Sequence, residues 1–419
     1  MSGAREAAPR SPVKAEIESA RQELAAWCAA RDYAGHDPFD ALNSRLFQAT
    51  PFKHSRLARL AWTQLFKRSP VNFRKLALVP AERNAKGTAL FALAALARFR
   101  TEPGAEAEAA ARALLRDLLS ARLAVAGARS MVAWGYNFDW QGRAFFAPRG
   151  TPTVVPTAFA VRALVEAARA FGEEKKPGTG TDQYLAADQY LAAARSACDF
   201  ILNGLARTVE TPDEICFSYT PLDRTRVFNA SLLAAEALAS VGALTGEQEL
   251  LDYAVRAARY VVRHQRADGS WAYGADDYQS WSDNFHTAFI LTSLARITAS
   301  CRASSDELAA ATRRGYEFWR ARFFLSNGWP KYFHDRLYPA DAHSAGAGLV
   351  ALAELGWMNA GAPELSVKIA LWAIRELRDP RGFFRYQRRR FYTIRTPYMR
   401  WAQAWMLYGL SRLLEESKQ

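Results

Sequence analysis

Two histidines stand at equivalent places in consecutive parts of the sequence, each shortly after an aspartate. His286 comes three residues after Asp283, and His343 comes two residues after Asp341. In both places a polar, aromatic loop gives way to an apolar run of helical period, so the aspartate is placed to cap a helix whose first turn holds the histidine. A cationic histidine is disfavoured at a helix N-terminus, which favours a neutral imidazole that accepts a proton. Two such groups at one site can divide the roles of base and acid.

Proton transfer at a sugar carbon beside a carboxylate would suit this pair. The abstraction needs a base, an acid and a cation that holds the developing negative charge. Epimerisation and β-elimination share this need, so the residue types do not separate the two reactions. The candidate catalytic residues are Tyr273, Asp283, His286, Tyr332, His343 and Arg400, with Arg395 and Arg143 as alternative cations.

Two other uses of the histidines stay open. A histidine behind a capping aspartate also fits an ordinary capped loop with a buried imidazole. A histidine pair can bind a metal ion, but no third ligand stands at a suitable spacing. We therefore predict no metal and no cofactor.

An aromatic residue precedes a tyrosine by two or three positions at five places. The tyrosines of these units are 83, 54, 59 and 54 residues apart. Such a regular spacing indicates repeated structural units. The units are Trp134-Gly-Tyr136, Phe217-Ser-Tyr219, Trp271-Ala-Tyr273, Trp329-Pro-Lys-Tyr332 and Phe384-Arg-Tyr386.

Helices of two kinds must position these units. After each unit comes a run that is apolar on nearly every face, as is typical of a helix surrounded by protein. These inner helices are predicted around 157–164, 230–238, 287–294, 345–352 and 402–410, with one more upstream at 88–96. Amphipathic outer helices are predicted at roughly 105–124, 185–206, 248–265, 305–324 and 364–378. The outer partner of the upstream inner helix is predicted from 54–67 or 15–30.

Alternating inner and outer helices can close into a ring around an axial funnel. We predict an all-α (α/α)6 toroid of six helical hairpins, with little or no sheet. It forms a single domain over residues 15–419, and residues 1–14 form a disordered tail. The loops that lead into the inner helices would gather all five tyrosines at one mouth of the funnel.

Aromatic rings at that mouth are suited to stack on sugars, and neighbouring charged groups to bind hydroxyls or a carboxylate. A guanidinium beside an aromatic ring suits a carboxylated sugar. The candidate substrate-binding residues are Tyr136, Asp139, Trp140, Arg143, Tyr219, Asp277, Trp281, Trp329, Tyr386, Arg395 and Trp401.

The formal net charge of +13 favours an acidic partner. Seven arginines lie between Arg381 and Arg400, near the predicted mouth. They favour an anionic glycan, or a membrane surface that carries a lipid-linked one, and no nucleic-acid motif accompanies them. The four cysteines have no metal or redox spacing, which predicts reduced thiols in the cytoplasm. The sequence has no run of about 20 apolar residues, so no membrane span is predicted. The oligomeric state is left open.

The motif Gln265-x-x-x-Gly269-x-Trp271 resembles the glutamine–tryptophan repeat of squalene-hopene cyclase-like toroids. The resemblance implies the architecture, in which the glutamine ties outer helices to hairpin loops. The acidic motif of those cyclases is missing, as is the zinc set of protein prenyltransferases.

Two further segments resemble uncharacterised toroid proteins of exopolysaccharide and lipopolysaccharide gene clusters: Asn284-Phe285-His286-Thr287 and Pro397-Tyr398-Met-Arg400-Trp401. The Arg400-Trp401 pair is also distantly similar to the carboxy-terminal toroid of glucuronyl 5-epimerases. That similarity implies roles for Tyr386 or Tyr392 and for Arg400 at a sugar carboxylate.

We therefore expect an enzyme of surface-polysaccharide biosynthesis that acts on an anionic, uronate-type glycan by epimerase or lyase chemistry. A glycoside hydrolase is the first alternative, and it needs two carboxylates about 5–10 Å apart. The carboxylate pairs to compare are Asp139 with Asp283 and Asp277 with Asp341. The second alternative is a non-catalytic glycan-binding protein of a biosynthetic complex.

Overall fold

A closed ring of six helices forms the centre of the molecule. The computed structural model describes residues 12–127, 130–172, 181–301 and 305–417. Each inner helix packs on the next one along the chain, and the last packs on the first. The inner helices are α4 (Ala85–Thr101), α6 (Val154–Gly172), α8 (Phe228–Thr245), α10 (Asn284–Ser300), α12 (Ala342–Leu355) and α14 (Ala404–Glu416).

Small residues let these helices approach closely. A Cβ atom at Gly346 of α12 would lie 2.5 Å from the carbonyl oxygen of Trp405 on α14, which only glycine avoids. By length and composition one described helix, α8, could cross a membrane, but most of it is buried inside the ring. Its apolar character is that of a core helix.

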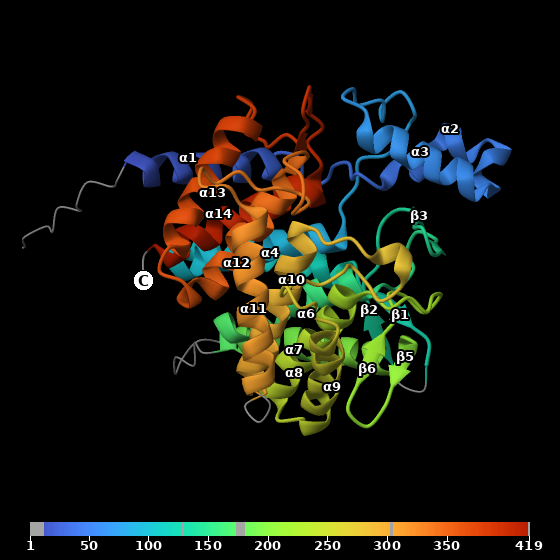
Figure 1. Ribbon diagram of the computed structural model, residues 1–419, viewed down its shortest axis with the longest axis vertical. Helices are drawn as coiled ribbons and strands as arrows, with labels where there is room; N and C mark the ends of the chain where they lie inside the picture. Colours follow the sequence, from blue (N-terminus) through green and yellow to red (C-terminus); the bar gives the residue numbers. More distant parts are fainter. Residues whose placement is uncertain (1–11, 128–129, 173–180, 302–304, 418–419) are drawn as a thin grey trace, which may run out of the picture.

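Six amphipathic helices surround the ring, each packed on an inner helix. Five follow their inner partner in the chain, and α1 completes the set beside α14. The outer helices are α1 (Pro12–Ala29), α5 (Ala105–Ser120), α7 (Thr181–Gly204), α9 (Gln248–Arg263), α11 (Ser305–Phe323) and α13 (Ala362–Leu377). The predicted (α/α)6 toroid is confirmed, and of the two candidates for the sixth outer helix 15–30 is correct (Figure 1). It packs on α14, however, and not on the upstream inner helix 88–96 with which it was expected to pair.

The predicted tail is too long by three residues. Helix α1 begins at Pro12, because proline is well tolerated in a first helical turn. Residues 1–11 lie outside the described part of the chain.

Short antiparallel strands occur in the loops that lead from outer to inner helices. β1 (Leu123–Val125) pairs with β2 (Met131–Ala133), β3 (Trp140–Gln141) with β4 (Phe146–Ala147), and β5 (Arg207–Glu210) with β6 (Ile215–Phe217). A three-stranded sheet joins β7 (Ala340–Asp341), β8 (Gln387–Arg388) and β9 (Thr393–Ile394). All these loops reach the N-terminal ends of the inner helices, so they form one mouth of the toroid.

Residues 30–84 form an N-terminal lobe beside this mouth (Figure 1). It contains η1 (Asp40–Asn43), α2 (Arg45–Gln48), η2 (Pro51–His54) and α3 (Arg56–Arg68), around a small core of its own. The buried Arg74 holds the lobe together by donating to Asp40 Oδ1 at 2.7 Å and to the Asp37 carbonyl at 2.9 Å.

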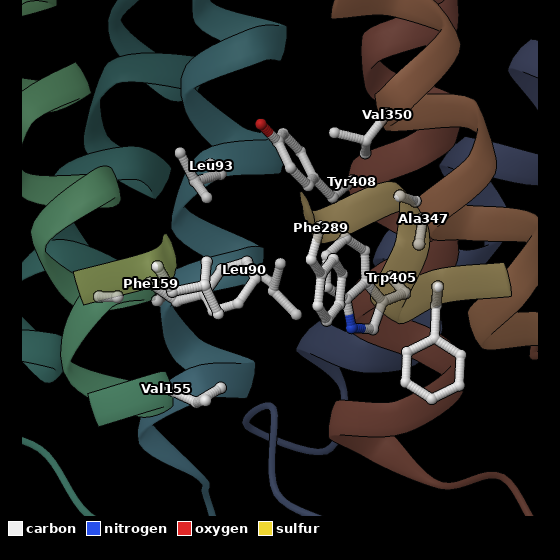
Figure 2. Packing of buried hydrophobic residues seen from close by; sticks show 14 of the residues in the cluster. Leu90, Leu93, Val155, Phe159, Phe289, Ala347, Val350, Trp405 and Tyr408 are labelled. Carbon is white, nitrogen blue, oxygen red and sulfur yellow. The ribbon is translucent and has the colours of Figure 1, made fainter. Parts of the chain in front are cut away.

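Aromatic side chains close the axis of the toroid at mid-depth. Phe159, Phe289 and Trp405 come from three inner helices, and their ring centroids lie 5.1–5.7 Å apart (Figure 2). The axis is therefore divided into two compartments, one at each end.

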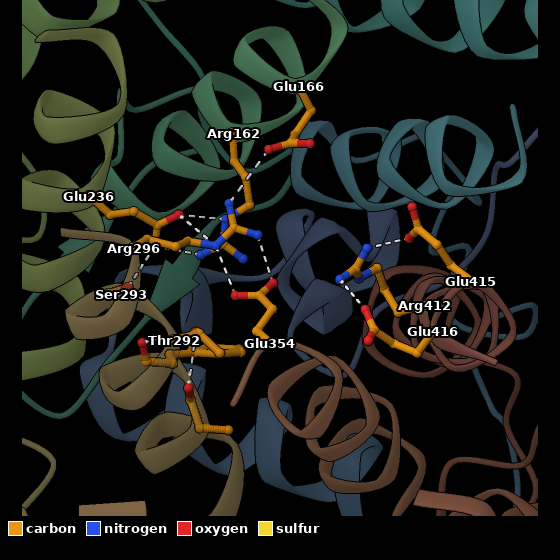
Figure 3. A network of polar contacts seen from close by, with 12 residues as sticks. Arg162, Glu166, Glu236, Thr292, Ser293, Arg296, Glu354, Arg412, Glu415 and Glu416 are labelled. Carbon is orange, nitrogen blue, oxygen red and sulfur yellow. Dashed lines mark hydrogen bonds and ion pairs between the residues drawn. The ribbon is translucent and has the colours of Figure 1, made fainter. Parts of the chain in front are cut away.

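Paired charges lie in the compartment at the end opposite the mouth, among the C-terminal halves of the inner helices. Arg162 makes two hydrogen bonds to Glu236, at 2.7 and 2.6 Å, and both side chains are buried (Figure 3). Arg296 binds Glu354 in the same way, at 2.9 and 2.7 Å. These groups satisfy one another, as buried charges must.

Candidate functional site

A cavity of about 870 Å³ opens at the mouth formed by the N-terminal ends of the inner helices. The mouth loops supply most of its wall, and the N-terminal lobe, the first turn of α10 and Trp401 supply the rest. Ten of the predicted site residues line it: Trp140, Arg143, Tyr219, Tyr273, Asp277, Trp281, Asp283, His286, Tyr332 and Trp401.

Asp283 and His286 form a hydrogen-bonded pair on the cavity wall. One carboxylate oxygen of Asp283 caps α10 by accepting from the His286 backbone N–H at 3.0 Å. The other accepts from His286 Nδ1 at 2.7 Å and from Trp281 Nε1 at 3.1 Å. A carboxylate only accepts, so Nδ1 carries the proton and Nε2 is left for a ligand. The His286 side chain is 23% exposed, in keeping with access from the cavity.

Tyrosine rings surround this pair. Tyr273 stacks on Trp281 with centroids 4.7 Å apart and contacts the His286 ring at the same distance. Burial is the main cause that raises the pKa of Tyr273 and Tyr332 well above the ordinary value. Both hydroxyls therefore stay protonated at neutral pH, and both can donate a proton or a hydrogen bond.

All five repeated tyrosines lie at this mouth, as predicted. Tyr136 and Tyr219 meet through their hydroxyls at 3.3 Å. Tyr219, Tyr273 and Tyr332 line the cavity, and Tyr386 lies deeper, 4.9 Å from the ring of Tyr398. The first aromatic of a unit has a structural role: Trp134 and Trp271 are buried and donate to carbonyls of the preceding outer helix.

His343 lies beneath the cavity floor instead of on its wall. Its ring centroid is 4.3 Å from both Phe285 and Trp401, which do line the cavity. Neither ring nitrogen has a hydrogen-bond partner among the described residues. Burial is the main cause that holds the pKa of His343 well below its usual range, so the ring is neutral. His286 and His343 therefore do not face the same ligand, contrary to the expected pair of base and acid.

Arg400 is also turned away from the cavity. A π-helical turn, η6 (Met399–Gln403), opens the last inner helix and places Trp401 on the cavity floor. Arg400 points into the N-terminal lobe and binds both carboxylate oxygens of Asp37, at 2.6 and 2.8 Å. Its guanidinium is thus engaged in a buried ion pair that ties the lobe to the ring.

Five predicted binding residues lie outside the cavity wall: Tyr136, Asp139, Trp329, Tyr386 and Arg395. Asp139 accepts from the Arg149 backbone N–H at 2.7 Å, so it holds its own loop. Trp329 packs on Trp372 of the outer helix α13, with centroids 5.3 Å apart.

Lys67 is a cavity residue that the sequence did not single out. It comes from α3, and its ammonium lies 4.2 Å from the ring centroid of Phe39 and 5.6 Å from that of Trp401. Burial, opposed by the carboxylates of Asp341 and Asp37, lowers the pKa of Lys67 to about 8. No local signal marks this lysine, because only the folding of the lobe against the mouth brings it to the cavity.

The carboxylate pairs considered for hydrolysis do not meet in the cavity. Asp139 and Asp341 are absent from its wall, and Asp341 caps α12 by accepting from the Ser344 backbone N–H at 2.9 Å. Asp283 is engaged by His286 and Trp281. Asp277 lines the cavity without its intended partner, Asp341.

No protein family matches the sequence, and comparison with curated proteins finds no relative. Solved structures do share the fold. A cellobiose 2-epimerase from Bacillus thermoamylovorans has a TM-score of 0.59 at 12% identity over 81% of this chain and 89% of its own. A GH76 α-mannanase from Bacteroides thetaiotaomicron has a TM-score of 0.58 at 12% identity over 80% and 87%. A possible GH105 member from Salmonella enterica has a TM-score of 0.59 at 10% identity over 98% and 96%. At these identities the likeness establishes the toroid fold.

Proposed function

We propose that the chain is a carbohydrate-active enzyme that moves a proton on an anionic, uronate-type sugar in the mouth cavity. The observation that carries this proposal is the pair of Asp283 and His286, which leaves Nε2 of the histidine to take or return a proton. Toroids of the same fold include sugar epimerases and a mannanase, which supports a sugar as the substrate. Surface-polysaccharide biosynthesis in the cytoplasm is the proposed setting.

Each residue of the cavity wall has a separate role in the proposed proton transfer. His286 Nε2 takes the proton from the carbon next to the carboxylate, and the Lys67 ammonium stabilises the resulting enolate-like charge. The hydroxyl of Tyr273 or Tyr332 then returns a proton to the opposite face of that carbon, which inverts it. In β-elimination the same hydroxyl protonates the departing oxygen. Lys67 takes the charge-stabilising role that was predicted for Arg400, because Arg400 is already bound to Asp37.

Deuterium exchange tests the proposal. The enzyme is incubated in heavy water with a uronate-containing oligosaccharide, and deuterium at the carbon beside the carboxylate is measured by NMR. We expect incorporation by the native chain and a loss of about 10²–10⁴-fold in H286Q, the usual worth of one positioned proton-transfer group. H264Q is the control, since His264 follows α9 and lies outside the cavity wall.

Each other outcome selects another function. Release of reducing ends without deuterium incorporation would identify a glycoside hydrolase. Binding of the oligosaccharide with no chemical change would identify a glycan-binding protein. Full incorporation by H286Q would remove His286 from the mechanism.

A further inference from the structure

Exposed apolar side chains gather on the N-terminal lobe and on the neighbouring hairpin of β8 and β9. In the described part of the chain 17 large hydrophobic side chains are exposed, and ten of them come from these two segments. The two segments make up a small part of the chain, so the exposure is concentrated. The ten are Leu46, Phe52, Leu57, Leu65, Val71, Phe73, Leu76, Leu78, Phe391 and Tyr392. We call this surface the lobe face.

Helix α3 shows how the lobe face is built. One side of α3 turns Leu60, Gln64 and Lys67 towards the sugar cavity. An adjacent stripe of α3 carries Leu57 and Leu65, which are 78% and 54% exposed and lie about two turns apart. An amphipathic helix of a globular domain normally buries such a stripe, so its exposure indicates a contact that the isolated chain does not make.

Positive charge predominates on the lobe face. Residues 41–81 contain eight lysines and arginines and not one acidic residue. Residues 380–395 contain six arginines and again no acidic residue. The cations are interleaved with the exposed apolar side chains, which is the composition of helices that lie in the interface of an anionic membrane.

The two segments form one continuous surface. The Tyr392 hydroxyl donates to the carbonyl of Arg68, at the end of α3, at 3.3 Å. Between Pro70 and the hairpin lies a shallow cavity of about 490 Å³. Its wall includes Arg385, Arg388 and Arg395 beside Phe391, a residue that is 84% exposed. Arg385 and Arg388 each also face a carboxylate, of Asp379 at 3.4 Å and of Glu376 at 3.8 Å. Three guanidinium groups beside an exposed aromatic ring still outnumber these carboxylates and suit a phosphate group below the acyl chains of a lipid.

We propose that the lobe face docks on a bilayer of anionic phospholipids, with Phe391 and the leucines of α3 entering the interface and the arginine cavity holding phosphate headgroups. A second copy of the chain would bring like charges together. Nucleic acid offers stacking for the four aromatic rings of the surface but nothing for its five leucines and Val71. Docking would place the sugar cavity, which α3 also lines, next to the membrane. The inference thus deepens the proposed function, with a lipid-linked glycan as the substrate.

Vesicle sedimentation tests the docking. The native chain is mixed with vesicles of phosphatidylcholine, with or without phosphatidylglycerol, and no sugar is present. We expect binding to the anionic vesicles only, with a steep decrease as salt increases. The double variant L57E/L65E and the hairpin variant F391S should each lower the affinity by about tenfold or more. R388Q/R395Q should lower it by a similar factor and reduce the salt dependence.

Controls separate docking from folding and from catalysis. L244E makes the same exchange at an exposed leucine near the end of α8, at the opposite end of the toroid, and should bind as the native chain does. Each variant must keep the native thermal transition, and F391S alters an exposed tip with little bearing on folding. Deuterium exchange on a soluble sugar is measured separately, so failure of either proposal is recognised by itself.

Three results would overturn the inference. The first is no binding of the native chain to anionic vesicles. The second is native affinity in both L57E/L65E and F391S. The third is binding of single-stranded RNA, in place of vesicles, that is lost in R388Q/R395Q, which would assign the lobe face to nucleic acid.

Discussion

Lys67 sets the charge of the cavity beside Trp401. Its ammonium lies among aromatic rings, and burial lowers its pKa to about 8. At neutral pH it is therefore mostly charged, and the charge is lost as the pH rises through that value. The same pKa shift also affects stability. Between about pH 8 and 10.5 Lys67 is deprotonated in the folded chain but still protonated in the unfolded chain. The free energy of unfolding therefore rises with pH over this range.

Binding of an anionic sugar should follow the charge of Lys67. We expect the affinity for a uronate-containing oligosaccharide to fall above about pH 8, by up to about tenfold for each further pH unit. A neutral oligosaccharide should show no such fall. Calorimetric titration at a series of pH values measures the effect, and K67M should remove it. K75M is the control, since Lys75 is exposed on the lobe. A pH dependence that survives in K67M would assign the carboxylate to another cation.

The turn after α9 shows how one element joins an outer helix to the mouth. Gln265 donates from Nε2 to the carbonyls of Gly269 and Ala311, at 3.0 and 2.9 Å. Arg314 of α11 donates to Gln265 Oε1 at 2.8 Å. The glutamine therefore ties two outer helices to a mouth loop, which is the role implied by the resemblance to cyclase-like toroids.

Gly269 makes this arrangement possible, and its replacement should destabilise the folded chain. It has a φ of +88°, and an added Cβ would lie 2.6 Å from the Arg314 carbonyl oxygen. We expect G269A to lower the free energy of unfolding by about 2–4 kcal/mol, from the left-handed backbone together with the clash. G246A is the matched control, because Gly246 has a φ of +74° in open space. It should lose only about 1–2 kcal/mol. Equal losses in urea denaturation would show that the turn yields to the added methyl group.

At the scale of the whole molecule, closure of the ring depends on charges that meet along the axis. Arg162 of α6, Glu236 of α8 and Ser293 of α10 form one buried network, and Arg296 links to Glu354 of α12 (Figure 3). Four consecutive inner helices are thereby joined below the aromatic layer. Removing Arg162 takes two hydrogen bonds from the buried Glu236 and leaves it Ser293 and the more distant Arg296, 3.8 Å away, which costs more than the pair contributes.

The Arg162–Glu236 pair should therefore show strong coupling. We expect R162M to lower the free energy of unfolding by about 3–5 kcal/mol and R162M/E236M to lose less than the sum of the single variants. The surface pair of Lys368 and Glu364 is the control, and K368M should leave the urea midpoint unchanged. A loss in R162M no larger than in K368M would mean that water or a rearrangement satisfies Glu236.

The sequence by itself determined the helices, their order and the mouth at which the repeated tyrosines gather. A run apolar on all faces reports burial, and an amphipathic run reports one buried face, so inner and outer helices are distinguishable locally. Asp283 as the cap of α10 is likewise a local property, since the cap and the N–H that it binds are three residues apart.

Only the tertiary structure decided which side chains share the cavity. Arg400 is held away from the cavity by its ion pair with Asp37, which lies 363 residues away in the chain. His343 is covered because Trp401 and Phe285 come together above it. Lys67 enters because the N-terminal lobe folds back over the mouth. Periodicity carries no information on such encounters, since they depend on closure of the ring and on contacts between segments that are neighbours only in the folded chain.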